Sequence, residues 1–398
     1  MENLMNLADL FTPRARELVP PLWGPSAASE GTPTISLAYG LADPLVLPRE
    51  ELVETTAQIL ATDVDAVLNY APVAAELVTL VAERLRREGV AAHEQQVIIT
   101  YGSSQILGLL PQILVNPGDT ILVEAPTFMG AVGLFVRAGA QLVGVPVDAN
   151  GLDVDALEVT LRDLRARGVR PKFIYTIPNF QNPTGTTLSL ARRQRIVALA
   201  AEYGVIVVED DAYSDLRFHG EPLPPMAALD QEGWVLRVGT FSKILAPGLR
   251  VGWAHGPKAL IDRLRMVKVE GSSSPFISHL VARFSAEGRL DTHITSLRRH
   301  YAAKCATMIT ALHRELPELP FVPPDGGFFI WLRLPEGVSG RELEPVALQQ
   351  GVEVLHGNRC YADGSGAEYV RLAFSYVPET QIAGAIQRLG NSIRAVMR

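Results

Sequence analysis

Short apolar runs alternate with amphipathic segments along the first two thirds of the chain. Seven runs rich in β-branched residues predict strands at residues 96–100, 120–124, 141–147, 172–176, 205–209, 235–239 and 250–256. Between several of them apolar residues recur at helical spacing, as at 103–114 and at 189–204, where Gly204 is placed to end the helix. Apolar strands that alternate with helices are typical of a parallel sheet covered on both faces. We therefore predict an α/β domain with a mainly parallel, seven-stranded sheet.

The pattern changes near residue 275. Helical periodicity extends from about 276 to 316, and strand-like runs follow at 328–334, 352–356 and 369–374 before a final helix. Helices followed by strands indicate a separate, smaller α+β unit. The expected division is an N-terminal arm at 1–45, a large domain at 46–285 and a small C-terminal domain at 286–398.

Composition restricts the kind of partner. The 398 residues are 47% apolar and 20% charged, as in a globular protein large enough for two subdomains. A net charge of −7 provides no broad basic surface, which argues against nucleic acid and against an anionic membrane. No apolar run reaches the ~18 residues of a membrane span, and the N-terminus lacks the features of a signal peptide. We expect a cytoplasmic protein that acts on small molecules.

The sequence does not indicate a metal or disulfide site. Cys305 and Cys360 are too few and too isolated for a disulfide framework or a cysteine zinc site. The eight histidines form no ligand cluster, and HEQQV at His93 lacks the second histidine of a zinc-protease helix.

Polar residues follow the predicted strands, where ligands collect in a parallel sheet. Gly102, Ser103 and Ser104 could bind an anion at a helix N-terminus or only cap that helix. Phe128 could stack on a flat ring, although core packing is the commoner role for such an aromatic residue. Asn182 lies in QNPTG, where a simple turn is the alternative.

An acidic segment, EDDAYSD, follows the fifth predicted strand. Asp210 would be desolvated at the end of a buried strand, so its carboxylate needs a partner. Tyr213 lies three residues further along the same turn. A structural salt bridge and a contact with a bound cationic group both fit this pattern.

The segment VGTFSKILAPGLRVGW holds a lysine among apolar residues. Lys243 is one of five lysines, and its surroundings favour the neutral amine that attacks an aldehyde, with a surface lysine as the alternative. Thr240, Ser242 and Arg250 supply hydroxyls and a cation suited to a phosphate. An amine, an anion and a phosphate site together indicate pyridoxal 5′-phosphate (PLP).

The chain resembles the fold-type I PLP enzymes, specifically class I/II aminotransferases of the 2-aminoadipate and kynurenine aminotransferase group. The resemblance extends over nearly the whole chain and includes ISLAYGLADPLVLP, EAPTFMGA, GGFFIWLRLP and YVRLAFS. The order and spacing of QNPTG, DDAY and FSK…PGLR are its most specific part. It implies the PLP-transferase fold and a ping-pong transfer of an amino group from an L-amino acid to a 2-oxo acid.

The resemblance also implies roles for the matching residues. Lys243 would bond to the cofactor and carry the substrate α-proton, Asp210 would pair with the ring nitrogen, and Tyr213 and Asn182 would contact the ring hydroxyl. The remaining residues expected around the cofactor are Gly102, Ser103, Ser104, Phe128, Thr240, Ser242 and Arg250. Tyr70 resembles a tyrosine that reaches the neighbouring subunit's phosphate, which implies a homodimer with shared active sites.

Substrate-binding residues follow in the same way. Arg371 would hold the substrate α-carboxylate, with Gly40 and Asn182 beside it. Arg16 matches an arginine that meets a distal carboxylate or moves aside for an apolar side chain, and a solvated helix arginine is the alternative. Donors with acidic or with larger apolar or aromatic side chains are therefore expected.

Several segments depart from the group's pattern near the expected side-chain pocket. Tyr39 stands where the group commonly has glycine, and the segment after Tyr70 lacks a common glycine and arginine. Phe128 replaces a common tyrosine. Arg359 lies in HGNRCYADGSG, a loop that is usually richer in glycine.

Two other functions fit parts of the pattern. A PLP-dependent lyase, decarboxylase, racemase or cyclase would use the same cofactor residues, and resemblance of fold does not separate it from a transaminase. A DNA-binding regulator, with a winged-helix module of ~60 residues before such a domain, is not favoured because only ~30 residues precede the first matching motif.

Overall fold

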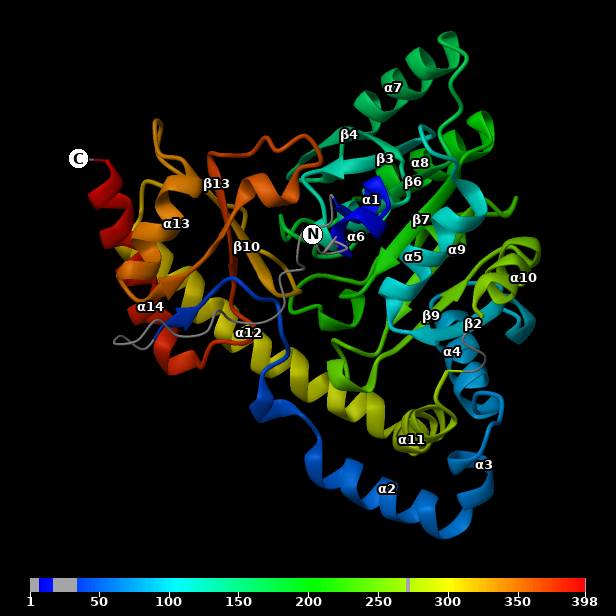
Figure 1. Ribbon diagram of the computed structural model, residues 1–398. Coiled ribbons are helices and arrows are strands. Elements are labelled where there is room, and N and C mark those ends of the chain that lie inside the picture. The colour runs from blue at the N-terminus through cyan, green and yellow to red at the C-terminus, as the bar shows by residue number, and fades with distance from the viewer. Residues whose placement is uncertain (1–6, 17–33, 270–272, 398) are drawn as a thin grey trace, which may run out of the picture.

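The computed structural model describes residues 7–16, 34–269 and 273–397 (Figure 1). Its helices are α1 (Pro13–Arg16), α2 (Arg49–Thr62), α3 (Val64–Leu68), α4 (Ala75–Arg87), α5 (Ser103–Leu114), α6 (Met129–Arg137), α7 (Val154–Ala166), α8 (Leu190–Tyr203), α9 (Met226–Leu229), α10 (Lys258–Val267), α11 (Pro275–Ser285), α12 (Arg289–Glu315), α13 (Gly340–Gln349) and α14 (Glu379–Val396). In the part of the chain that is described, no helix combines the length and apolar character needed to cross a bilayer.

The strands form one large and two small sheets. They are β1 (Ile35–Ser36), β2 (Val97–Tyr101), β3 (Thr120–Ala125), β4 (Gln141–Asp148), β5 (Gly151–Leu152), β6 (Phe173–Thr176), β7 (Ile206–Asp211), β8 (Val235–Thr240), β9 (Val251–His255), β10 (Phe329–Arg333), β11 (Val352–Glu353), β12 (Leu355–His356) and β13 (Tyr369–Ala373). The large sheet has the order β2-β9-β8-β7-β6-β3-β4-β5.

The large sheet confirms the predicted α/β class. Strands β8, β7, β6, β3 and β4 are parallel, whereas β9 is antiparallel to both of its neighbours. All seven predicted strands are present, and the two-residue β5 adds an eighth. Helices α5, α6 and α10 lie on one face of the sheet and α7 and α8 on the other (Figure 1). Their apolar side chains pack against the strands. This two-sided cover explains why the central strands β3, β6, β7 and β8 are buried along almost their whole length.

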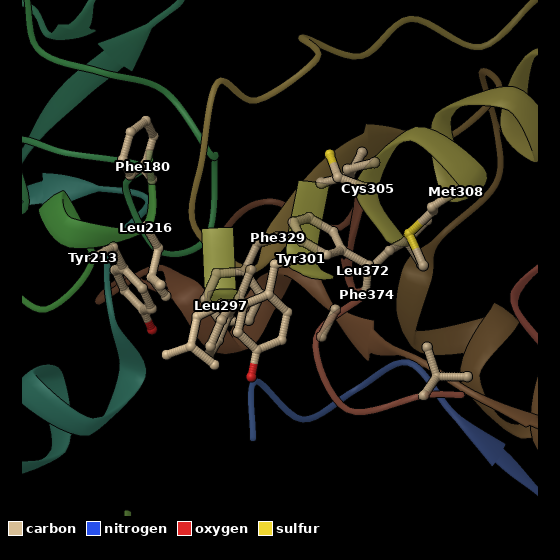
Figure 2. Packing of buried hydrophobic residues seen from close by; sticks show 14 of the residues in the cluster. Phe180, Tyr213, Leu216, Leu297, Tyr301, Cys305, Met308, Phe329, Leu372 and Phe374 are labelled. Atoms are coloured by element: carbon tan, nitrogen blue, oxygen red, sulfur yellow. The ribbon is translucent and has the colours of Figure 1, made fainter. Parts of the chain in front are cut away.

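The C-terminal part contains an antiparallel sheet of order β10-β13-β12, packed with α12, α13 and α14. An apolar core continues from this sheet into the large one. Figure 2 shows part of it, with Tyr213 and Phe180 on one side and Tyr301, Phe329 and Phe374 on the other. The predicted division of the chain at residues 45 and 285 stays a prediction.

The segment from residue 35 to residue 43 is attached to the C-terminal part. Strand β1 pairs in parallel with β11, and the Leu37 carbonyl oxygen accepts a hydrogen bond from the Ala373 amide at 2.7 Å. Further along, the buried Asp43 carboxylate accepts bonds from Lys304 Nζ at 2.5 Å and from His300 Nε2 at 2.8 Å. Burial opposes ionisation of Asp43, but these partners hold its pKa below the usual value.

Removing the Lys304 cation is expected to destabilise the fold. Lys304→Met leaves the carboxylate of Asp43 buried without its main counter-charge, so the free energy of unfolding should fall by about 3 kcal/mol. The exposed Lys258–Asp262 pair provides the control, because Lys258→Met should cost below about 0.5 kcal/mol. Urea unfolding of both variants measures the difference. Equal, small losses would contradict a structural role for the Lys304 ion pair.

Candidate active site

Lys243 lies at the carboxyl edge of the large sheet, three residues after β8 ends. Its Nζ atom donates a hydrogen bond to the Gly40 carbonyl oxygen at 2.9 Å and lies 5.6 Å from the centre of the Phe328 ring. Desolvation, with the positive charges of Arg371 and Arg250, lowers the pKa of Lys243 to about 8. More of this amine is therefore neutral and nucleophilic near neutral pH than in an exposed lysine.

Asp210 is a buried residue near the end of β7. Its Oδ2 atom accepts a hydrogen bond from the Tyr175 hydroxyl at 2.6 Å, while no donor among the described residues reaches its buried Oδ1 atom. Burial raises the pKa of Asp210 to about 6; the Tyr175 bond lowers it and the negative charge of Asp211 raises it further. Oδ1 is therefore an acceptor that a bound donor would satisfy.

Arg371 on β13 meets the loop that follows β6. Its guanidinium donates to Asn182 Oδ1 at 2.8 Å and to the Ala38 carbonyl oxygen at 2.5 Å, and lies 4.4 Å from the Phe329 ring centre. Its buried Nε atom has no acceptor, and no carboxylate pairs with it, within the ranges that the structure describes. Burial lowers the pKa of Arg371. A bound anion would compensate this buried cation.

Tyr213 follows β7 and packs edge-to-face on Phe328 and Phe329, with ring centres 5.5 and 5.9 Å apart. Burial raises the pKa of its hydroxyl above the usual value, opposed by the charge of Arg371 and a bond with Asn182. The hydroxyl therefore stays protonated and can donate. The structure brings Tyr213, Asn182 and Arg371 into one buried group.

The residues predicted to bind a phosphate come from two neighbouring segments. Ser103 and Ser104 begin α5. The Ser242 amide donates to Thr240 Oγ1 at 3.1 Å, and the Thr240 hydroxyl donates to Ser242 Oγ at 2.9 Å. A Cβ atom on Gly102, whose φ is +72°, would lie 2.6 Å from a terminal nitrogen of the Arg250 guanidinium. The arginine thus reaches the first turn of α5 because residue 102 is glycine. A helix N-terminus beside hydroxyls and a guanidinium favours an anion.

Three further residues with predicted roles, Tyr39, Gly40 and Phe128, are half-buried. A Cβ atom on Gly40 would lie 2.3 Å from Phe329 Cζ, so only glycine fits there. Tyr39 is half-buried between Ala38 and Gly40, and burial and a bond with Glu353 raise the pKa of its hydroxyl. Phe128 is half-buried at the start of α6.

Two predicted residues lie at the surface instead of in this buried group. Tyr70 is fully exposed just after α3, and Arg16 is exposed at the end of α1. Their expected roles, at a neighbouring subunit's phosphate and at a distal carboxylate, stay predictions.

The sequence pattern does not indicate two buried residues that support the site. Tyr175 lies in the apolar run KFIYT and reads as a core position. Glu124, at the end of β3, accepts hydrogen bonds from Thr176 Oγ1 at 2.5 Å and from Gln181 Nε2 at 2.9 Å. It thereby ties the end of β3 to the loop that carries Asn182, and burial raises its pKa to about 7. The sequence signal for Glu124 is a single carboxylate at the end of the apolar run TILVE.

Comparison with known proteins identifies relatives over almost the full chain. The sequence pattern of aminotransferase class I and II matches residues 37–389. Aromatic-amino-acid aminotransferase 1 of Thermococcus litoralis is 36% identical over 93% of this chain and 90% of that protein. The 2-aminoadipate transaminase of Thermus thermophilus is 35% identical over 91% of each chain. The crystal structure of Pyrococcus horikoshii kynurenine aminotransferase in complex with PMP superposes with a TM-score of 0.92 at 34% identity, covering 99% of each chain.

Proposed function

The chain belongs to the aminotransferase class I and II family, and we propose that its site takes amino groups from L-amino acids with acidic or with larger apolar or aromatic side chains. It is a PLP-dependent aminotransferase, an enzyme that moves an amino group between an amino acid and a 2-oxo acid. The observation that carries the proposal is the grouping of the Lys243 amine, the open Oδ1 of Asp210 and the Arg371 guanidinium.

The residues present fit PLP. Lys243 offers an amine to the aldehyde carbon, and Asp210 Oδ1 lacks the donor that a protonated ring nitrogen would supply. The first turn of α5, with Thr240, Ser242 and Arg250, suits the phosphate. When bound, PLP withdraws electrons from the substrate α-carbon and so makes the proton there acidic.

Lys243, Asp210 and Arg371 then have separate roles in the proposed reaction. Lys243 is suited to take that α-proton and return it, because its pKa of about 8 lies closer to neutral pH than that of an ordinary lysine. The Asp210 anion stabilises positive charge on the ring nitrogen. Arg371 holds the α-carboxylate and fixes which bond of the α-carbon faces the amine.

The donor range is supported by the surroundings of Arg371 and by the relatives. Leu355 lies directly opposite Arg371 in the β12–β13 pairing, and it packs in an apolar cluster with Tyr39, Trp331 and Cys360. Such a wall suits a large apolar or aromatic side chain. The named substrates of the relatives are aromatic amino acids and 2-aminoadipate.

A panel of amino donors tests the proposal. Each L-amino acid is incubated with the PLP-loaded enzyme and a 2-oxo acid, and both product amino acid and product 2-oxo acid are quantified. Equal amounts of the two products, which exceed one equivalent per enzyme only when a 2-oxo acid is supplied, are expected for leucine, phenylalanine, glutamate and 2-aminoadipate. Release of carbon dioxide or ammonia without a 2-oxo acid would instead show a lyase or decarboxylase.

Arg16 is proposed to contact the distal carboxylate of acidic donors. Arg16→Ala should then lower kcat/KM for glutamate and 2-aminoadipate by roughly 10- to 100-fold, the loss expected for a charge-assisted hydrogen bond, and should spare leucine. Arg49→Ala, another exposed arginine, is the matched control. If acidic and apolar donors lose activity equally, Arg16 only supports the fold, and Arg359 and Tyr39 become the next residues to vary.

We also propose a homodimer located in the cytoplasm. Tyr70 is fully exposed in the single chain, and Val64 and Leu68 on the preceding helix α3 and Val53 on α2 are also largely exposed. A second subunit covering this surface would put Tyr70 at its neighbour's phosphate site. Analytical ultracentrifugation should show a dimer; a monomer with full activity at nanomolar concentration would disprove it, and cell fractionation checks the location.

A further inference from the structure

Tyr175 is the residue that touches Asp210 from the core of the protein. Its hydroxyl donates to Asp210 Oδ2 at 2.6 Å, and it is the one hydrogen-bond donor to this carboxylate that the described residues provide. Both side chains are buried, and they come from the adjacent parallel strands β6 and β7. Tyr175 therefore contacts Asp210 from the side of the sheet and leaves Oδ1 for the bound cofactor.

The phenol ring is fixed in place by aromatic packing. Tyr175 is fully buried, and its ring meets Phe135 edge-to-face with centres 5.4 Å apart. Phe135 in turn packs edge-to-face on Phe173, at 5.1 Å. A ring held in this way presents its hydroxyl at one position, so the bond to Asp210 also fixes the rotation of the carboxylate.

The charges around Asp210 show that the Tyr175 hydrogen bond stabilises its carboxylate. Asp211 adds a like charge next to Asp210, but its carboxylate is bonded to Arg237 Nη2 at 2.5 Å and Asn179 Nδ2 at 3.1 Å. Glu124 is a second buried carboxylate whose pKa responds to Asp210. No cation pairs with Asp210 in the described parts of the chain. The Tyr175 hydroxyl is thus its main stabilising partner before the cofactor binds.

We propose that Tyr175 is a positioning residue that controls how strongly Asp210 attracts the proton of the cofactor's ring nitrogen. The inference rests on the proposed role of Asp210 toward PLP. A hydrogen bond donated to Oδ2 stabilises the carboxylate and makes it a weaker base. Without it, Asp210 attracts the ring proton more strongly, the proton lies closer to Oδ1, and the ring withdraws electrons less well.

The ring nitrogen itself provides the readout. Enzyme loaded with PLP that carries ¹⁵N in the ring is compared with its Tyr175→Phe variant by NMR. The ¹⁵N resonance is expected to move toward that of an unprotonated pyridine, while kcat falls on the order of 10- to 100-fold and KM for the donor changes little. Incorporating 3-fluorotyrosine at position 175, a more acidic phenol that donates a stronger bond, should move the resonance in the opposite direction.

Two further variants separate the possible outcomes. Tyr301→Phe removes an equally buried hydroxyl, bonded to the Asp43 amide at 3.1 Å, and should leave the ¹⁵N resonance unchanged. Asp210→Asn should move the resonance fully to the unprotonated position; no movement there would overturn the role of Asp210 and with it the premise. A resonance that responds to Asp210→Asn but is identical in folded, loaded Tyr175→Phe and 3-fluorotyrosine enzymes would overturn the inference about Tyr175 alone.

Discussion

The Lys243→Ala variant should fold and still bind PLP, but lose transamination by on the order of 10⁴-fold, since no other group can both bond to the aldehyde and carry the α-proton. The remaining lysines are already engaged: Lys172, Lys258 and Lys304 pair with aspartates, and Lys268 lies 5.6 Å from the Tyr101 ring centre. None of them can therefore replace the missing amine without leaving its partner.

Borohydride reduction followed by peptide mass spectrometry measures this result. In the parent enzyme the reduced cofactor should be found on the peptide that contains Lys243, and in the variant on no peptide. Lys172→Ala is the matched control and should keep the label and the activity. A label retained at full level in Lys243→Ala would show that another residue holds the cofactor.

The lowered pKa of Lys243 adds a pH dependence to cofactor loading. Only the neutral amine attacks an aldehyde, so the loading rate of the cofactor-free protein should rise with pH and level off above about 8. An exposed lysine would continue to gain neutral amine up to about pH 10.4. Stopped-flow absorbance after mixing with PLP gives the profile.

Arg371→Lys should lower kcat/KM by on the order of 10²- to 10³-fold for every donor, acidic or apolar. The α-carboxylate is common to all of them, and a lysine cannot replace the two parallel bonds of a guanidinium. Lysine would also lose the bonds to Asn182 and to the Ala38 carbonyl, which hold the guanidinium over Phe329.

Steady-state kinetics with leucine, phenylalanine and 2-aminoadipate tests the Arg371 prediction. The exposed Arg333 on the adjacent strand β10 provides the control, because Arg333→Lys should leave kcat/KM unchanged. A loss confined to one class of donor would assign Arg371 to the side chain of the substrate and not to its α-carboxylate.

Local patterns predict the large sheet and the polar residues at its carboxyl edge. Strands such as β6 and β8 are buried at every position because both faces are covered, and polar residues are expected after them where a ligand is bound. Asp210 is the second-last residue of β7, Lys243 follows the end of β8 by three residues, and Asn182 lies in the loop after β6. Their position relative to the predicted strands therefore marks them in the sequence as candidate ligand-binding residues.

Buried residues whose partners are distant in the chain cannot be predicted from the sequence in the same way. Tyr175 looks like any aromatic residue of a buried strand, and only the pairing of β6 with β7 shows that its hydroxyl meets Asp210. Lys304 lies on the long helix α12 between Ala303 and Cys305. It is fully buried, and its partner Asp43 comes from 261 residues earlier in the chain. Such contacts depend on tertiary packing, which a periodic pattern does not encode.

The attachment of residues 35–43 to the C-terminal part has a consequence for synthesis. Ala38, which accepts a bond from Arg371, precedes it by 333 residues, and Gly40, which accepts a bond from Lys243, precedes that residue by 203. The segment at residues 35–43 is synthesised well before its partner strands β11 and β13. At roughly 5–20 residues per second, it waits many seconds for them. A chain that stops before β13 holds every strand of the large sheet but lacks Arg371, the residue proposed to bind the substrate α-carboxylate.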